Sequence, residues 1–293
     1  MTLPPLAGVL LPLVIAVLMF GLGTTLTLGD FTSALRHPRA LVCGLVCQLL
    51  VMPVLCFGLV VVLDLPPELA VGMLLIAASP GGTTASLFSH LARGDVAVNI
   101  TMTAVNTVLS VVTLPMIVNL ALAYFQPAEV GRAGLGAAEV TRLLLVILLP
   151  VVAGLAVRAR SADVARRLDP VIRVVSVVFL VLIAVTTVLR ERDQLMAQFG
   201  RVGLAATLFC VLSLVLGYTV PRLFGVEGPR AVAVGMDVGV HNSALAVTIA
   251  LDPGMLGNPE IAIPGVVYAM VTVPCAALVI WLINGRRRAT VPA

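Results

Sequence analysis

Long apolar segments alternate along the chain with short segments that carry proline, glycine and charge. Each apolar segment approaches the roughly 20 residues that an α-helix needs to cross about 30 Å of hydrocarbon. The pattern therefore predicts an all-α membrane protein with about nine transmembrane helices in a single domain, residues 1–293. The expected spans are 6–28, 40–63, 69–92, 96–124, 140–158, 171–189, 202–220, 231–251 and 261–284.

The composition agrees with this pattern. Hydrophobic residues make up 60% of the 293 residues and charged residues 11%, which a soluble domain of this length does not show. We therefore expect the surface of the protein to contact the lipid bilayer. The net charge of +4 does not indicate nucleic acid, because the basic residues follow the loops. No protein partner is predicted.

The arginines predict the orientation. If successive loops alternate between the two sides, only five of the 18 basic residues fall on one side, and these are Arg132, Arg142, Arg190, Arg192 and Arg201. Cytoplasmic loops carry the excess of basic residues in membrane proteins. We expect a plasma (inner) membrane protein whose amino end is external and whose carboxyl end is cytoplasmic.

The third expected span is interrupted near its middle by Pro80, Gly81 and Gly82. Proline removes a backbone donor and glycine permits non-helical angles, so backbone groups are freed at membrane depth. Such a backbone persists only where it lines a cavity or packs against protein. An ordinary proline kink, repaired by neighbouring helices, is the alternative interpretation.

The eighth expected span contains the densest polar cluster of any apolar segment, from Gly235 to Ser243. Asp237 lies near its centre, where a carboxylate costs about 2.5–3.5 kcal/mol on insertion scales. The chain has no lysine and no arginine in the middle of a span, so a bound cation or a proton is the expected partner. A neutral aspartate that hydrogen-bonds between helices is the alternative.

The two interrupted spans lie five helices apart, so they enter the membrane with opposite polarity. This offset predicts inverted-topology repeats with two crossed discontinuous helices. In such folds, half-helix amino ends face an anionic substrate and freed carbonyls hold coupling cations.

At these positions the sequence resembles the bile acid:sodium symporter family. The matching pieces are Gln48 with Met52-Pro53, Pro80-Gly81-Gly82-Thr83, Leu91-Ala92-Arg93-Gly94, Thr103 with Pro115, and Val238-Gly239 with Asn242-Ser243. The resemblance implies a core domain, formed by about 40–124 and 202–251, and a panel domain, formed by about 6–28, 140–189 and 261–284. It also implies sodium-coupled import of an organic anion by alternating access, in the nine-span form of a family whose members often have ten.

The resemblance places one sodium site on Ala85, Ser86, Asn99, Thr103 and Asp237. It places a second on Gln48, Asp237, the backbone carbonyls of Val238 and Val240, and His241. The family usually has glutamine at position 241, and an imidazole is a poor sodium ligand. One or two Na+ ions are therefore expected. By resemblance, Thr83, Thr84, Asn242 and Ser243 face the substrate.

Other functions remain open at this point. A sodium-independent or proton-coupled organic anion carrier, an uncoupled channel and a receptor would use the same fold. An intramembrane enzyme would need paired carboxylates or a metal motif at membrane depth, whereas only one acidic residue lies there. We therefore do not expect an enzyme.

Overall fold

Helices form almost all of the part of the chain that the structure describes. In this computed structural model, that part comprises residues 7–33, 36–82, 84–127, 136–190 and 192–289. Within these ranges, the β-type pairing consists of one isolated bridge between Gly81 and His241. The expectation of an all-α protein is confirmed.

The helices follow the apolar segments closely. The first half contains α1 (Ala7–Thr25), α2 (Leu28–Ser33), α3 (Pro38–Val46), the π-helix η2 (Cys47–Val51), α4 (Met52–Val62), α5 (Pro67–Ala78), α6 (Ala85–Leu91) and α7 (Val96–Phe125). The second half contains α8 (Ala137–Arg160), α9 (Ala162–Arg190), α10 (Arg192–Leu223), α11 (Gly228–Gly239), α12 (Ser243–Leu251) and α13 (Pro259–Ala289).

Five helical stretches in the described ranges are long and apolar enough to cross a membrane. They are Pro38–Val62, Val96–Phe125, Val140–Arg160, Gly200–Leu223 and Pro259–Gly285. Pro12–Thr25 and Pro67–Ala78 are apolar but shorter. The chain is therefore a multi-pass membrane protein, and the total of nine spans stays a prediction.

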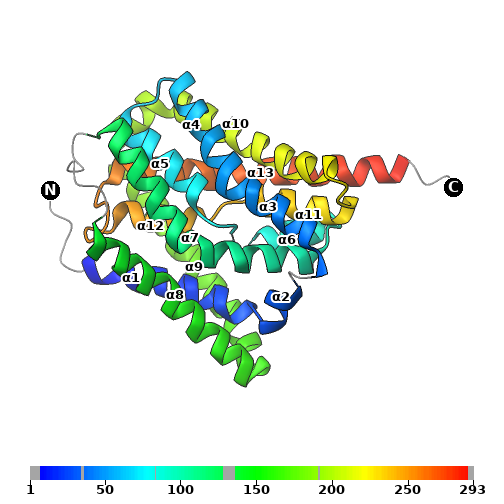
Figure 1. Ribbon diagram of the computed structural model, residues 1–293. Helices are drawn as coiled ribbons and strands as arrows, with labels where there is room; N and C mark the ends of the chain where they lie inside the picture. The colour runs from blue at the N-terminus through cyan, green and yellow to red at the C-terminus, as the bar shows by residue number, and fades with distance from the viewer. Residues whose placement is uncertain (1–6, 34–35, 83, 128–135, 191, 290–293) are drawn as a thin grey trace.

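One group of helices consists of α1, α8 and α9. Both α8 and α9 pack against α1, and Figure 1 shows α1 and α8 side by side along the lower side of the molecule. Glycines permit the close approach: a Cβ atom on Gly154 of α8 would meet the carbonyl oxygen of Phe20 and lie 2.8 Å from the amide nitrogen of Thr24. Small residues at helix interfaces allow this kind of packing inside membranes.

The remaining long helices pack around the two interrupted ones. α11 packs against α10, α7 and α6, whereas α5 packs against α7, α4 and α13. α13 lies mainly against α10, α12 and α5, and it contacts α9 less extensively. Figure 1 shows this larger group above α1 and α8.

Both predicted interruptions are present as breaks rather than kinks. α5 ends at Ala78, and the following Ser79 is extended, with φ −72° and ψ 141°. α11 ends at Gly239, and Val240 (φ −115°, ψ 77°) and Asn242 (φ −78°, ψ 79°) are also non-helical. The kink interpretation is therefore wrong for the third segment.

One boundary differs from its expected position. α10 begins at Arg192, ten residues before the expected span at 202. The stretch between Arg192 and Phe199 contains no proline or glycine and consists mostly of good helix formers, so nothing in it stops the helix.

Candidate functional site

The two interrupted segments cross and pair through their backbones. The amide of Gly82 donates to the carbonyl oxygen of Val240 at 2.6 Å, and the amide of Asn242 donates to that of Pro80 at 2.9 Å. These bonds form the antiparallel bridge centred on Gly81 and His241. Each break thus supplies hydrogen-bond partners for the other, which satisfies backbone groups that lipid cannot.

Asp237 lies on α11, one half-turn before the break, and its side chain is fully buried. The hydroxyl of Thr103, on α7, donates to its Oδ1 atom. Its Oδ2 atom has no hydrogen-bond partner among the described residues. Because a buried carboxylate without a compensating charge is costly, this arrangement suits a cation or a proton.

A second polar contact between α7 and α11 lies one helical turn away. The side-chain nitrogen Nδ2 of Asn99 donates to the carbonyl oxygen of Ala233 at 2.9 Å. The Oδ1 atom of Asn99 is buried and accepts no hydrogen bond within the described ranges. Asn99 and Thr103, like Ala233 and Asp237, are four residues apart, so the two contacts stack along one helix interface. The interface presents several oxygens, which are the ligands that hard cations such as Na+ prefer.

Gly81 packs directly on the Asp237 carboxylate. A Cβ atom at Gly81 would overlap with Oδ1 of Asp237 and would lie 2.8 Å from Cγ and 3.0 Å from Oδ2. The backbone of the first break is thus held against the charged group of the second interrupted helix. Glycine is required here because any side chain would displace the carboxylate.

The predicted second cation site has a different arrangement. The Nε2 atom of Gln48 lies 3.0 Å from the carbonyl oxygen of Ser79 and 3.1 Å from Nδ1 of His241. The Gln48 amide nitrogen donates to Ser79 O, and Nδ1 of His241 also lies 3.3 Å from that carbonyl oxygen. The amide hydrogens, rather than an amide oxygen, face the histidine. The Oε1 atom of Gln48 is buried without a hydrogen-bond partner in the described part of the chain, and position 241 offers ring nitrogens instead of an oxygen.

Gln48 is positioned by the π-helix. The amide of Met52 donates to the carbonyl oxygen of Cys47, five residues earlier, and Pro53 follows directly. A proline ring clashes with the carbonyl four residues before it, and the wider π turn relieves this clash. Pro53 was the sequence signal from which this feature could have been found.

Two aromatic residues that sequence reasoning missed hold His241 in place. Its ring stacks on Phe209 with centroids 5.2 Å apart and an interplanar angle of 18°. Tyr268 meets it edge-on at 5.6 Å and donates a 2.8 Å hydrogen bond to the carbonyl oxygen of Gly239. Both residues lie in apolar segments, where an aromatic residue resembles any other core residue.

The remaining predicted residues occupy varied positions. Asn242 caps α12, and its Oδ1 atom accepts from the Leu245 amide at 3.0 Å. Ser243 is buried, Ser86 is partly buried and Thr84 is exposed at the start of α6. Thr83 lies outside the described residues. Val238 and Ala85 are buried, and the Val240 carbonyl already accepts the Gly82 amide.

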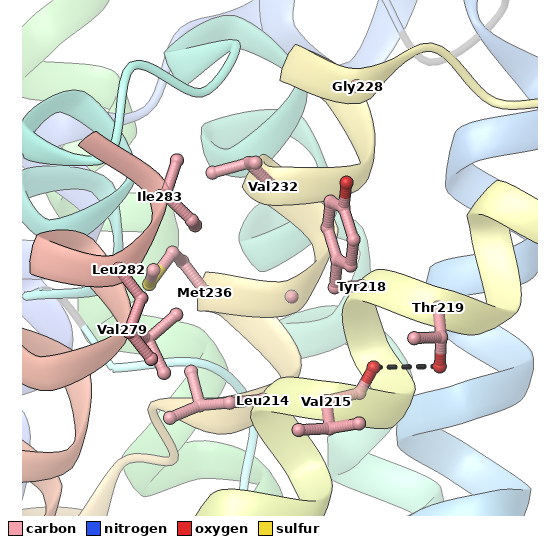
Figure 2. Close-up of a pocket in the computed structure, with 11 residues that line it drawn as sticks. Leu214, Val215, Tyr218, Thr219, Gly228, Val232, Met236, Val279, Leu282 and Ile283 are labelled. Atoms are coloured by element: carbon pink, nitrogen blue, oxygen red, sulfur yellow. Dashed lines mark hydrogen bonds between the residues drawn. The ribbon is translucent and has the colours of Figure 1, made fainter. Parts of the chain in front are cut away.

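A cavity of about 380 Å³ lies on another face of α11 (Figure 2). Side chains of α10, α11 and α13, including Leu214, Met236 and Val279, surround it and are mostly apolar. Met236 points into this cavity, whereas its neighbour Asp237 faces α7. Thr84, Asn242 and Ser243, the described residues among those predicted to bind the substrate, do not line it.

Comparisons with known proteins agree on one family. The sequence profile of the Sodium Bile acid symporter family matches residues 12–198. The probable sodium/metabolite cotransporter BASS1 of Arabidopsis thaliana chloroplasts is 30% identical over 251 residues, which are 85% of this chain and 60% of the plant protein. The uncharacterized sodium-dependent transporter YocS of Bacillus subtilis (strain 168) is 28% identical over 256 residues (87% and 77%). The human ileal sodium/bile acid cotransporter is 26% identical over 241 residues (82% and 68%).

The contact of Gly81 with Asp237 makes a testable prediction. We expect Gly81→Ala to lower the free energy of unfolding by about 1–3 kcal/mol, because the added methyl group overpacks the crossing. It should also weaken any stabilisation by Na+, measured as a thermal shift in sodium relative to potassium. Gly58→Ala on α4 is the control, since no atom lies within 4 Å of a Cβ atom there. An unchanged sodium shift in Gly81→Ala would contradict the prediction.

Proposed function

Because this chain belongs to the Sodium Bile acid symporter family, we propose that it is a sodium-coupled transporter that imports a small organic anion. The observation that carries the proposal is the buried Asp237 carboxylate at the crossing, which has a hydroxyl donor but no arginine within the described residues. The resemblance seen in the sequence is confirmed by the profile match. The chain spans 60% of the length of the plant protein. The sodium cotransport named for the relatives supports the proposal by analogy.

The proposed cation site combines Asp237 with Asn99, Thr103 and Ser86. Thr103 already touches the carboxylate, and the Asn99 oxygen on the same interface has no donor in the described part of the chain. A sodium ion bound there would offset the negative charge of the buried Asp237. Because this charge would otherwise repel an anionic substrate, binding of the ion favours binding of the anion. A proton on Asp237 is the competing explanation, and the dependence on sodium distinguishes the two.

We expect Asp237→Asn to abolish sodium-dependent uptake in proteoliposomes and to weaken sodium binding at least about tenfold, or 1.4 kcal/mol. The amide keeps the size of the side chain but removes the charge that offsets a desolvated cation. Asp163→Asn is the control, because Asp163 is exposed on α9 and pairs with Arg166 on the surface. Full sodium-dependent uptake by Asp237→Asn would refute the assignment.

We propose that one sodium ion accompanies each anion. The imidazole of His241, held by Phe209, Tyr268 and Gln48, stands where the second ion would need an oxygen ligand. One sodium with a monovalent anion carries no net charge. A second ion would add a charge worth about 2.3 kcal/mol per 100 mV of membrane potential.

The role of His241 in limiting the protein to one sodium ion per anion can be tested. We expect a Hill coefficient near one for sodium and uptake that is insensitive to membrane potential in the unmodified protein. His241→Gln should restore an oxygen ligand, raise the coefficient above one and make uptake sensitive to potential. Phe209→Leu, which removes the stacked ring but keeps His241, is the control. Cooperative sodium dependence in the unmodified protein would contradict a single ion.

The proposed substrate position is the crossing near Thr83, Thr84, Asn242 and Ser243. Asn242 and Ser243 stand at the amino end of α12, where the helix dipole favours an anion. By analogy with relatives named as bile acid or metabolite cotransporters, the substrate class is a small carboxylate or sulfated compound. We further propose nine spans with an external amino end, which the distribution of the arginines supports. The antiparallel crossing of the two breaks supports an inverted repeat.

Alternating access requires two groups of helices that move relative to each other. We assign α1, α8 and α9 to the moving panel and the helices around the crossing to the core, including α13, which packs mainly on α10, α12 and α5. The sequence had instead suggested that 261–284 belongs to the panel. An ion pair joins the groups: Nη2 of Arg142 on α8 lies 3.3 Å from Oδ1 of the buried Asp252, just after α12. This contact must break when the two groups of helices separate on the side of the membrane where Arg142 lies, which the predicted orientation makes the external side.

Arg142→Gln should therefore open the external side more often. We expect a membrane-impermeant thiol reagent to label a cysteine placed at Ser243, in a variant without the native cysteines, at least about tenfold faster. Exchanging the charges with Arg142→Asp and Asp252→Arg together should restore slow labelling. Arg166→Gln, which removes an exposed ion pair within α9, is the control. Equal labelling rates in all variants would exclude this pair as a gate.

A further inference from the structure

A second cavity, of about 290 Å³, lies between the start of α3 and the loop that leads into α11. Its lining includes Arg36, Arg39, Arg230, His37 and Glu227. The cavity is separate from the crossing, and none of the described residues of the proposed transport site lines it. It joins the connection between α2 and α3 to the loop that precedes the Asp237-bearing helix α11.

The charges around this cavity do not balance. Glu227, the one acidic residue in the lining, lies 3.5 Å from Nη1 of Arg230, and Asp95 lies 3.7 Å from Nε of the same arginine. Both carboxylates therefore contact Arg230. Arg36 and Arg39 are exposed and form no ion pair with any described residue. Two guanidinium groups thus remain without a counter-charge beside the cavity.

Two helices also begin at this cavity. α3, which continues through η2 and α4, starts at Pro38, and α11 starts at Gly228. Neither residue before these helices, His37 or Glu227, caps its helix with a side-chain hydrogen bond. The residue before each helix therefore supplies no side-chain acceptor to the first-turn amides, and Pro38 and Pro229 in those first turns carry no amide hydrogen. Helix amino ends carry partial positive charge and favour anions, and arginine binds phosphate oxygens in a fork.

We propose that this cavity is a binding site for a phosphate group, which contacts Arg36 and Arg39 and the amino ends of α3 and α11. The phosphate belongs either to the headgroup of an anionic membrane lipid or to a soluble phosphate compound. Occupancy ties the start of α3 to the loop before α11. The site therefore stabilises the folded protein without contributing to the transport site itself.

The test is a thermal-shift titration of the purified, delipidated protein with inorganic phosphate, and separately with mixed micelles of phosphatidylglycerol or phosphatidylcholine. Ionic strength is held constant with potassium chloride and phosphate is added as its potassium salt, so that general screening is the same in every arm and sodium does not vary. We expect phosphate, phosphatidylglycerol or both to raise the melting temperature by mass action, with phosphatidylcholine less effective. A shift with phosphate identifies a soluble phosphate compound as a ligand, and a shift with phosphatidylglycerol alone identifies a lipid headgroup.

The matched variants separate this site from general attraction to basic residues. Arg36→Gln with Arg39→Gln should raise the ligand concentration for half-maximal shift at least about tenfold, since each arginine supplies charge-assisted hydrogen bonds. Arg158→Gln with Arg160→Gln, at the end of α8, removes the same charge away from the cavity and should leave the shift intact. Equal effects of the two pairs, or no shift with any ligand in the unmodified protein, would overturn the proposal.

Discussion

The structure depends on the backbone pairing between its two interrupted helices. The amides of Gly82 and Asn242 reach carbonyl oxygens of the opposite break, Val240 and Pro80, at 2.6 Å and 2.9 Å. At membrane depth each unsatisfied backbone group costs several kcal/mol, so neither break is stable without the other. The same pairing brings Gly81 against Asp237 and places Ser79 beside Gln48. The side-chain chemistry of the site thus follows from a main-chain constraint.

The sequence predicts the breaks but not the way in which they pair. Proline and paired glycines are local signals, and the polar cluster from Gly235 to Ser243 is conspicuous inside an apolar segment. The bridge itself joins Gly81 to His241, and main-chain hydrogen bonds leave no signature in the side chains. The early start of α10 was missed for a related reason. Hydropathy indicates which residues lie in the apolar part of the membrane, and a helix can begin before that part.

The candidate site was predictable to a similar degree. Asp237 was found because a carboxylate is rare among apolar neighbours, and its contact with Thr103 agrees with the set of residues that the family resemblance suggested. Phe209 and Tyr268 could not be found, since their role arises only when α10 and α13 bring them to His241 in the break between α11 and α12. The profile match ends at residue 198, so the roles proposed for Asp237 and His241 depend on the geometry of the crossing and on the motif resemblance described above.

The two buried aspartates of the second half show how differently this chain treats a carboxylate. Asp252 is buried at the end of α12, and Nη2 of Arg142 lies 3.3 Å from its Oδ1 atom as a counter-charge supplied by the protein. Asp237, fifteen residues earlier and equally buried, receives one hydroxyl and the backbone of Gly81. The fold therefore has the means to neutralise an aspartate with an arginine and does not do so at the crossing. A fixed arginine there would hold the carboxylate in one state, whereas the sodium ion that we propose at this position could bind to it and leave again in each transport cycle. The difference between the two sites is what a coupled transporter requires, because the ion must be able to leave.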